Sequence, residues 1–239
     1  MKPTKTAPPP TLPEDLPTEL RPRILFEDTH LIVVDKPAGL LSQGEHTGDF
    51  NLVDWCRHHF GRNYVGLVHR LDRNTSGLLI IAKRSKAAQR LTHSLQEGSL
   101  KRSYLAWVAG GLTQRLELTD FLLKNEATNE SRVVREGTPR AKRAHLSATP
   151  LGRGQWQETP LSLVEIELDT GRSHQIRVQM AHANHPLLGD SKYAKTPALK
   201  SFPRLALHSH HLQVPHPMGG NLIDIKCPLP ADLAQLCFV

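Results

Sequence analysis

Most apolar residues of the chain fall into short runs that are typical of β-strands and are separated by turn-forming residues. These runs predict strands at residues 24–26, 31–34, 67–68, 78–82, 104–108, 133–134, 144–148, 161–168, 205–214 and 222–225. Helical spacing of apolar residues predicts a helix over 51–60. Ser85 as cap and Gly98 as stop predict a second helix over 85–96, and Ser173 as cap predicts a third that runs to about residue 183. A short helix is expected after Pro230.

The order of these elements favours an α+β fold. Strands outnumber helices and do not alternate regularly with them, which argues for a largely antiparallel sheet and against a doubly wound one. Residues 1–20 contain six prolines and few large apolar groups, so they are expected to form a flexible or polyproline-like tail. We find no internal repeat and no long linker, and therefore expect one domain over residues 21–239.

The composition is that of a soluble globular protein, with 38% hydrophobic and 22% charged residues. No apolar run is long enough to cross a bilayer, and no apolar segment follows the two N-terminal lysines as a secretory signal requires. Three cysteines are an odd number and do not stand at metal-ligand spacing. This usage fits a reducing compartment, so we expect a cytoplasmic protein.

The chain is basic, with a formal charge of +7 and a pI near 9.5. Such a charge suits a polyanionic partner, because cationic side chains that neutralise phosphates release condensed counterions. Moderate positive charge also simply aids solubility. Charge by itself leaves both interpretations open.

The stretch Val68-His69-Arg70-Leu71-Asp72-Arg73-Asn74-Thr75-Ser76-Gly77-Leu78 places a carboxylate between two guanidinium groups in a turn between apolar strands. A carboxylate that stays ionised there suits a nucleophile or a group that stabilises positive charge at a sugar carbon. Asp72 could instead cap the turn or pair with an arginine. The spacing alone favours this second, structural role.

A second stretch, Thr170-Gly171-Arg172-Ser173-His174-Gln175-Ile176-Arg177, leads into the third predicted helix. On a helix, His174 and Arg177 would share a face, and Arg172 could approach from the same side. The turn could bind a phosphate or a carboxylate. Equally, its arginines could lie in solvent or pair with Glu165 or Glu167.

Tyr104 begins a predicted strand in the stretch Lys101-Arg102-Ser103-Tyr104. An aromatic ring at such a place can stack on a base, although a half-buried tyrosine that only packs is more common. The histidines at 208, 210 and 211 lie close together, but no cysteine or carboxylate completes a ligand set. We expect no metal site.

These three stretches, in this order, resemble the RluA family of RNA pseudouridine synthases. The likeness extends over residues 24–41, 185–190 and 205–208 and covers nearly everything except the N-terminal tail. The resemblance implies the pseudouridine synthase fold, which is a mixed, largely antiparallel sheet flanked by helices with a basic central cleft. It also implies that residues 21–239 are the catalytic domain, of the short form without an N-terminal RNA-binding domain.

The resemblance implies a role for individual residues. Asp72 matches the family's essential aspartate, which acts at the glycosidic carbon, and Tyr104 matches the tyrosine that stacks on the target base. Arg177 matches the residue that pairs with and orients this aspartate, and Ile176 matches an aliphatic residue packed against the site. Arg70 matches an arginine that fills the gap left by a flipped-out nucleotide.

Four neighbours of these residues, His69, Arg73, Arg172 and His174, are expected to contact the substrate. The sequence departs from the family's pattern at Gln179, where a histidine is usual, and no clear match exists for the polar loop over 124–138. Substrate contacts in that loop stay open.

The resemblance implies isomerisation of uridines in ribosomal or transfer RNA, most simply in a stem-loop, without a cofactor or a metal. We expect a monomer with no obligatory protein partner and no membrane association. One alternative is a catalytically inactive RNA-binding relative, but Asp72, Tyr104 and Arg177 are all present. A glycoside hydrolase with two carboxylates is a second alternative, but the matched stretches supply arginines where it needs a second acid.

Overall fold

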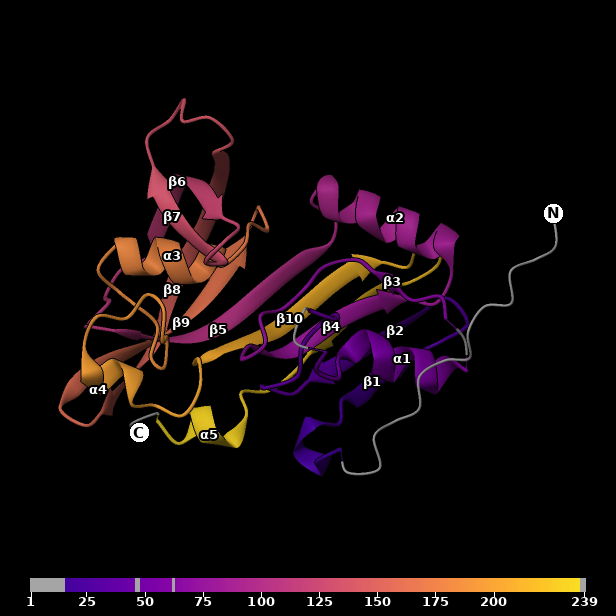
Figure 1. Ribbon diagram of the computed structural model, residues 1–239, viewed down its shortest axis with the longest axis horizontal. Helices are drawn as coiled ribbons and strands as arrows, with labels where there is room; N and C mark the ends of the chain where they lie inside the picture. Colours follow the sequence, from indigo (N-terminus) through magenta and orange to yellow (C-terminus); the bar gives the residue numbers. More distant parts are fainter. Residues whose placement is uncertain (1–15, 46–47, 62, 237–239) are drawn as a thin grey trace. The chain divides into compact units, whose positions relative to one another are not determined.

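The computed structural model describes residues 16–45, 48–61 and 63–236 (Figure 1). The chain divides into two compact units, each built from two segments. The first unit comprises residues 1–100 and 212–227, and the second comprises residues 101–211 and 228–239.

The first unit contains a 3-10 turn η1 (Thr18–Leu20), strands β1 (Arg23–Glu27), β2 (Leu31–Lys36), β3 (Gly66–Leu67), β4 (Ser76–Ala82) and β11 (Leu222–Lys226), and helices α1 (Leu52–Phe60) and α2 (Ser85–Gln96). Strand β2 lies between β1 and β4, and β3 also pairs with β4. These pairs are all antiparallel. Strand β4 is buried at every residue, which explains its unbroken apolar run.

The core of the first unit is formed by β2, β4 and α2 together with residues of the segment 212–227. Helix α2 lies along the sheet (Figure 1), where Ala87 and Leu91 are fully buried. Gly66 permits this close packing, because a methyl group at residue 66 would lie 2.8 Å from Cβ of Ala88. The strand before the Asp72 loop is therefore held directly under a helix.

The second unit contains strands β5 (Lys101–Ala109), β6 (Leu116–Asn125), β7 (Glu130–Val134), β8 (Lys142–Trp156) and β9 (Thr159–Leu168), and helices α3 (Gln175–His182), α4 (Pro197–Lys200) and α5 (Ala231–Ala234). Its strands follow the order β5-β9-β8-β6-β7 through antiparallel pairs. Strand β10 (Leu207–Pro215) belongs to both units, because the division falls between His211 and Leu212.

Two apolar clusters of described residues help to stabilise the second unit. The larger one surrounds Trp107, which is fully buried and donates a hydrogen bond from Nε1 to the carbonyl of Leu233 over 2.9 Å. The smaller one packs Val178 of α3 against Leu122 and Ala144. Helix α3 consequently lies against β6 and β7 (Figure 1).

The structure confirms the predicted α+β class and the largely antiparallel strand pairing. Strand β6 was not predicted, and β8 continues to Trp156, well past the predicted end at residue 148. A register shift between Pro150 and Gly152 accommodates the proline within β8.

The predicted helix caps at Ser85 and Ser173 are both wrong. Ser85 is the first residue of α2, Arg84 precedes it, and no side chain caps that helix. Helix α3 begins only at Gln175, because His174 adopts a left-handed conformation with φ of 55°. Asn51, in contrast, accepts a hydrogen bond from the amide of Asp54 and caps α1.

Most of the tail expected over residues 1–20 lies outside the described residues. In its last part, Leu16 is buried and η1 forms a short turn. The single catalytic domain over 21–239 and the basic cleft stay predictions. No helix among the described residues is long and apolar enough to span a membrane.

Candidate active site

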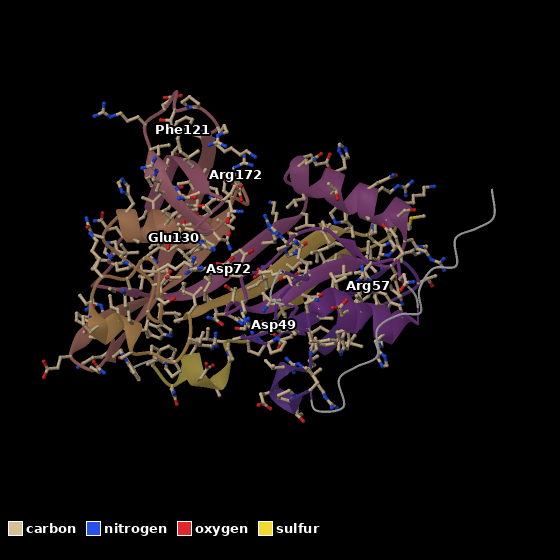
Figure 2. The ribbon with its side chains drawn as sticks, in the orientation of Figure 1. Asp49, Arg57, Asp72, Phe121, Glu130 and Arg172 are labelled. Carbon is tan, nitrogen blue, oxygen red and sulfur yellow. The ribbon has the colours of Figure 1, made fainter. Side chains whose placement is uncertain are left out.

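Asp72 lies in the loop over 68–75 that joins β3 to β4 in the first unit (Figure 2). Its side chain is half-buried, whereas the neighbouring Arg70 is exposed and Leu71 is buried. The loop carbonyl of Asp72 accepts a hydrogen bond from the amide of Thr75 over 3.0 Å, which closes a turn.

The main chain on both sides of Asp72 is held by side chains from the end of β2 and from the segment after it. The Ser42 hydroxyl donates to the Leu71 carbonyl (2.6 Å) and accepts from the Leu71 amide (3.1 Å). The fully buried Lys36 ammonium donates to the carbonyls of Arg73 (3.1 Å), Leu40 (2.8 Å) and Pro37 (2.9 Å). These bonds fix the backbone that carries the carboxylate.

Arg73 is tied to the same segment. Its Nε donates to the Gly39 carbonyl over 3.0 Å, and the Gly39 amide donates back to the Arg73 carbonyl over 2.9 Å. One terminal nitrogen of its guanidinium forms an exposed ion pair with Asp49 at 2.7 Å. The structure thus gives Arg73 a role in holding the loop, and its predicted substrate contact stays a prediction, as does that of the buried His69.

Tyr104 lies on β5 in the second unit, and only 4% of its surface is exposed. It faces Ile166 across the antiparallel pair of β5 and β9. A ring this deeply enclosed has one preferred orientation.

Arg177 forms a buried, two-pronged ion pair with Asp190. Its Nε and a terminal nitrogen each lie 2.8 Å from a carboxylate oxygen. The amides of Lys192 (2.9 Å) and Tyr193 (3.1 Å) also donate to Asp190, which is fully buried. Burial by itself raises the pKa of Asp190, but Arg177 and these two amides outweigh it and lower that pKa below its usual value.

Tyr193 connects this ion pair to His174. The Arg177 guanidinium lies 5.2 Å from the centre of the Tyr193 ring, and the Tyr193 hydroxyl lies 2.9 Å from Nδ1 of His174. The prediction that His174 and Arg177 share a helix face is wrong, because His174 precedes α3. The two residues are linked through the tyrosine instead.

Gln175 organises the turn before α3. Its side-chain oxygen accepts from the Thr170 hydroxyl (2.7 Å) and the Arg172 amide (3.0 Å), and its nitrogen donates to the carbonyl of His145 (3.0 Å). The exposed Arg172 (Figure 2) donates from Nε to the carbonyl of Arg143. Ile176 is buried at the start of the helix.

The second unit thus brings together Arg177 and His174, while Asp72, Arg70, His69 and Arg73 belong to the first unit. The pairing of Asp72 with Arg177 and the stacking role of Tyr104 stay predictions. Four residues that organise these segments were missed from the sequence, namely Lys36, Ser42, Gln175 and Asp190. The available signals were a lysine that ends an apolar strand and an aspartate that directly follows Gly189.

The chain belongs to the family of RNA pseudouridylate synthases, whose pattern matches residues 30–182. Among its relatives, "Ribosomal large subunit pseudouridine synthase D" from Nitrosomonas europaea is 37% identical over 231 residues, which cover 90% of this chain and 64% of the relative. The "Uncharacterized RNA pseudouridine synthase YhcT" from Bacillus subtilis is 36% identical, over 90% of this chain and 70% of that protein. This confirms the family resemblance found in the sequence.

A solved structure supports the fold. The human "RNA Pseudouridylate Synthase Domain Containing 1" superimposes with a TM-score of 0.75 at 23% identity, over 89% of this chain and 85% of that one. At this level of identity the likeness establishes the fold alone.

Proposed function

We propose that this protein is an RNA pseudouridine synthase that isomerises uridines in ribosomal or transfer RNA. The bond between N1 of uracil and C1′ of ribose breaks, the base turns, and C5 bonds to C1′. The proton on C5 is then lost and N1 gains one, so the reaction needs no cofactor. The observation that carries the proposal is Asp72, which lies within the residues matched by the family's pattern, on a loop whose backbone is fixed on both sides.

In this proposal residues 21–239 act as the catalytic domain. Asp72 acts at C1′ or on the base, Arg177 orients it, and Tyr104 stacks on the uracil with Ile176 packed beside it. Arg70 enters the gap left by the everted nucleotide, since both faces of the uracil must be reached. His69, Arg73, Arg172 and His174 contact the RNA around it. The protein works as a cytoplasmic monomer.

The decisive experiment measures release of tritium from uracil C5 when the purified protein meets unmodified ribosomal and transfer RNA labelled at that position. Asp72→Asn should lower the rate by at least about 10²–10⁴-fold, the range for loss of a positioned acid–base group. Asp224→Asn, the same change at an exposed residue of the first unit, should leave it unchanged.

The alternatives give different results in this assay. A glycoside hydrolase would liberate uracil without losing the C5 tritium. An inactive RNA-binding relative would bind RNA with no release at all. Wild-type activity in Asp72→Asn would remove Asp72 from the mechanism.

The role of Arg70 is tested by comparing substrates. Arg70 is exposed, and its side chain makes no ion pair with any residue in the described ranges. Arg70→Ala should therefore reduce activity on stem-loops more than on flexible single strands, because only a paired region leaves a gap to fill. Equal losses on both substrates would contradict a role in nucleotide flipping.

A further inference from the structure

Arg102 is a buried cation without a counter-ion among the described residues of its own unit. It lies on β5, and 8% of its surface is exposed. Within the described ranges, its Nε has no hydrogen-bond partner, and no carboxylate of the second unit lies within ion-pair distance. A desolvated guanidinium in this state costs free energy, which a bound anion would recover.

The alternation of side chains along β5 explains why no carboxylate reaches Arg102. Arg102 and Tyr104 lie on one face of the strand, and Tyr104 is opposite Ile166. The acidic residues of β9 lie opposite the intervening positions, with Glu167 across from Ser103 and Glu165 across from Leu105. Glu165 accepts a hydrogen bond from the Ser103 hydroxyl over 2.8 Å. On β5 and β9, the face shared by Arg102 and Tyr104 therefore carries no acidic residue.

The end of the Arg102 side chain lies beside the turn that precedes α3. A methyl group at Gly171 would lie 3.4 Å and 3.8 Å from the two terminal nitrogens of Arg102, so glycine keeps this approach open. The Thr170 hydroxyl of this turn is engaged elsewhere, because it donates to the side chain of Gln175. The exposed Arg172 adds a second positive charge next to Gly171.

We infer that Arg102 and the turn at Gly171 form a binding site for a phosphate group of the RNA, namely that of the nucleotide whose base stacks on Tyr104. The inference rests on the proposed function. Residues two apart on a strand are separated by about 6.6–6.8 Å, a span that one nucleotide covers between its base and its phosphate. A guanidinium fork matches the geometry of phosphate oxygens, and burial strengthens the bond.

Three variants test the site. Arg102→Met removes the charge at similar volume, Arg102→Lys keeps the charge without the fork, and Arg153→Met removes an exposed arginine of β8 as the matched control. Because Arg102 has no partner in the part of its unit that the structure describes, Arg102→Met should melt at or above the temperature of the wild type. A melting temperature lowered by more than about 4 °C would mean that this chain itself supplies the anion, and would overturn the inference.

RNA binding and turnover are then measured on a stem-loop that the wild type modifies. Arg102→Met should raise KM about 10- to 100-fold, as expected for loss of a charge-assisted hydrogen bond, and should lower the salt slope of binding by about 1. Arg102→Lys should restore the slope but only part of the affinity. Arg153→Met should change neither quantity.

A neutral methylphosphonate in place of the phosphate of the target uridine identifies the contact. It should weaken binding by the wild type as much as Arg102→Met does, and should weaken Arg102→Met no further. The inference would be overturned if Arg102→Met left KM and the salt slope of binding unchanged while the wild type turned over its substrate. It would also be overturned if the methylphosphonate weakened binding by Arg102→Met as much as it weakens binding by the wild type. Absence of tritium release by the wild type from any RNA would overturn the proposed function instead.

Discussion

The loop that carries Asp72 and the segment that carries Arg177 are immobilised by different means. In the first unit, Lys36 and Ser42 hold main-chain atoms on either side of Asp72. In the second unit, Asp190 holds the end of the Arg177 side chain itself, through two hydrogen bonds to its guanidinium. The comparison teaches that a carboxylate can be placed by fixing its backbone, whereas a long arginine must be fixed at its charged end.

The largest effect is expected where an ion pair is buried. Asp190→Asn should lower the free energy of unfolding by about 3–5 kcal/mol, because Arg177 then remains buried beside a neutral group. Asp232→Asn is the matched control: Asp232 also forms a two-pronged pair with an arginine, Arg204, but is 46% exposed. Asp232→Asn should lower the free energy of unfolding by only about 0–1 kcal/mol. Urea unfolding measures both, and equal losses would contradict the comparison.

The next largest effect is expected at Lys36, which holds the Asp72 loop in the first unit. Lys36→Met should lower the free energy of unfolding by about 1.5–3 kcal/mol, because three carbonyls lose a charged donor. Activity should fall as well, since the Arg73 carbonyl is released one residue after Asp72. Ser42→Ala, on the other side of Asp72, should cost only about 0.5–1.5 kcal/mol. A larger loss for Ser42→Ala would show that the serine, and not the lysine, dominates the loop.

The pH dependence of stability sharpens the same contrast. The pKa of Asp190 is lowered in the folded protein. The ionised carboxylate therefore contributes its full stabilisation above its pKa in the unfolded chain, about 3.9, and this stabilisation is lost as the pH falls through the lower pKa of the folded protein. The difference in stability between the wild type and Asp190→Asn should thus be constant above about pH 5 and shrink below pH 4. Urea midpoints measured from pH 7 to pH 3 would reveal it, and a constant difference would refute it.

The smallest effect is expected at the exposed pair of the first unit. Asp49→Asn removes the ion pair with Arg73. The side chain of Asp49 is 43% exposed and that of Arg73 is 50% exposed. The free energy of unfolding should change by about 0–1 kcal/mol, because solvent screens the pair and Arg73 keeps its bond to Gly39. A loss beyond 2 kcal/mol in urea unfolding would mean that this pair, and not Lys36, fixes the loop.

Much of the fold could be predicted from the apolar pattern. Strand β4 lies where an apolar run predicted a strand, and helix α2 spans the predicted residues 85–96. Strand β6 escaped prediction because its residues are mostly partly exposed and do not alternate cleanly. The continuation of β8 depends on a register shift at Pro150, which is a tertiary accommodation that the sequence does not reveal.

The candidate site was predictable only in part. The motifs pointed to Asp72, Tyr104 and Arg177, but the spacing did not reveal Asp190, which is thirteen residues from its partner Arg177. Backbone geometry explains the error at His174, since the left-handed residue there delays α3. At Gln179, where the family usually has histidine, the side chain donates to Asp120 of β6 over 2.7 Å and thereby ties α3 to the sheet.

The division of the chain has a consequence for biosynthesis. Leu212, Val214, Ile223 and Cys227 belong to the core of the first unit, yet they are translated after nearly all of the second. The nascent first hundred residues therefore leave the ribosome with an incomplete interior, and no single truncation yields either half whole. We expect the first unit to complete its folding only after the last strand has left the ribosome. Until then, chaperones are expected to bind its exposed apolar surface.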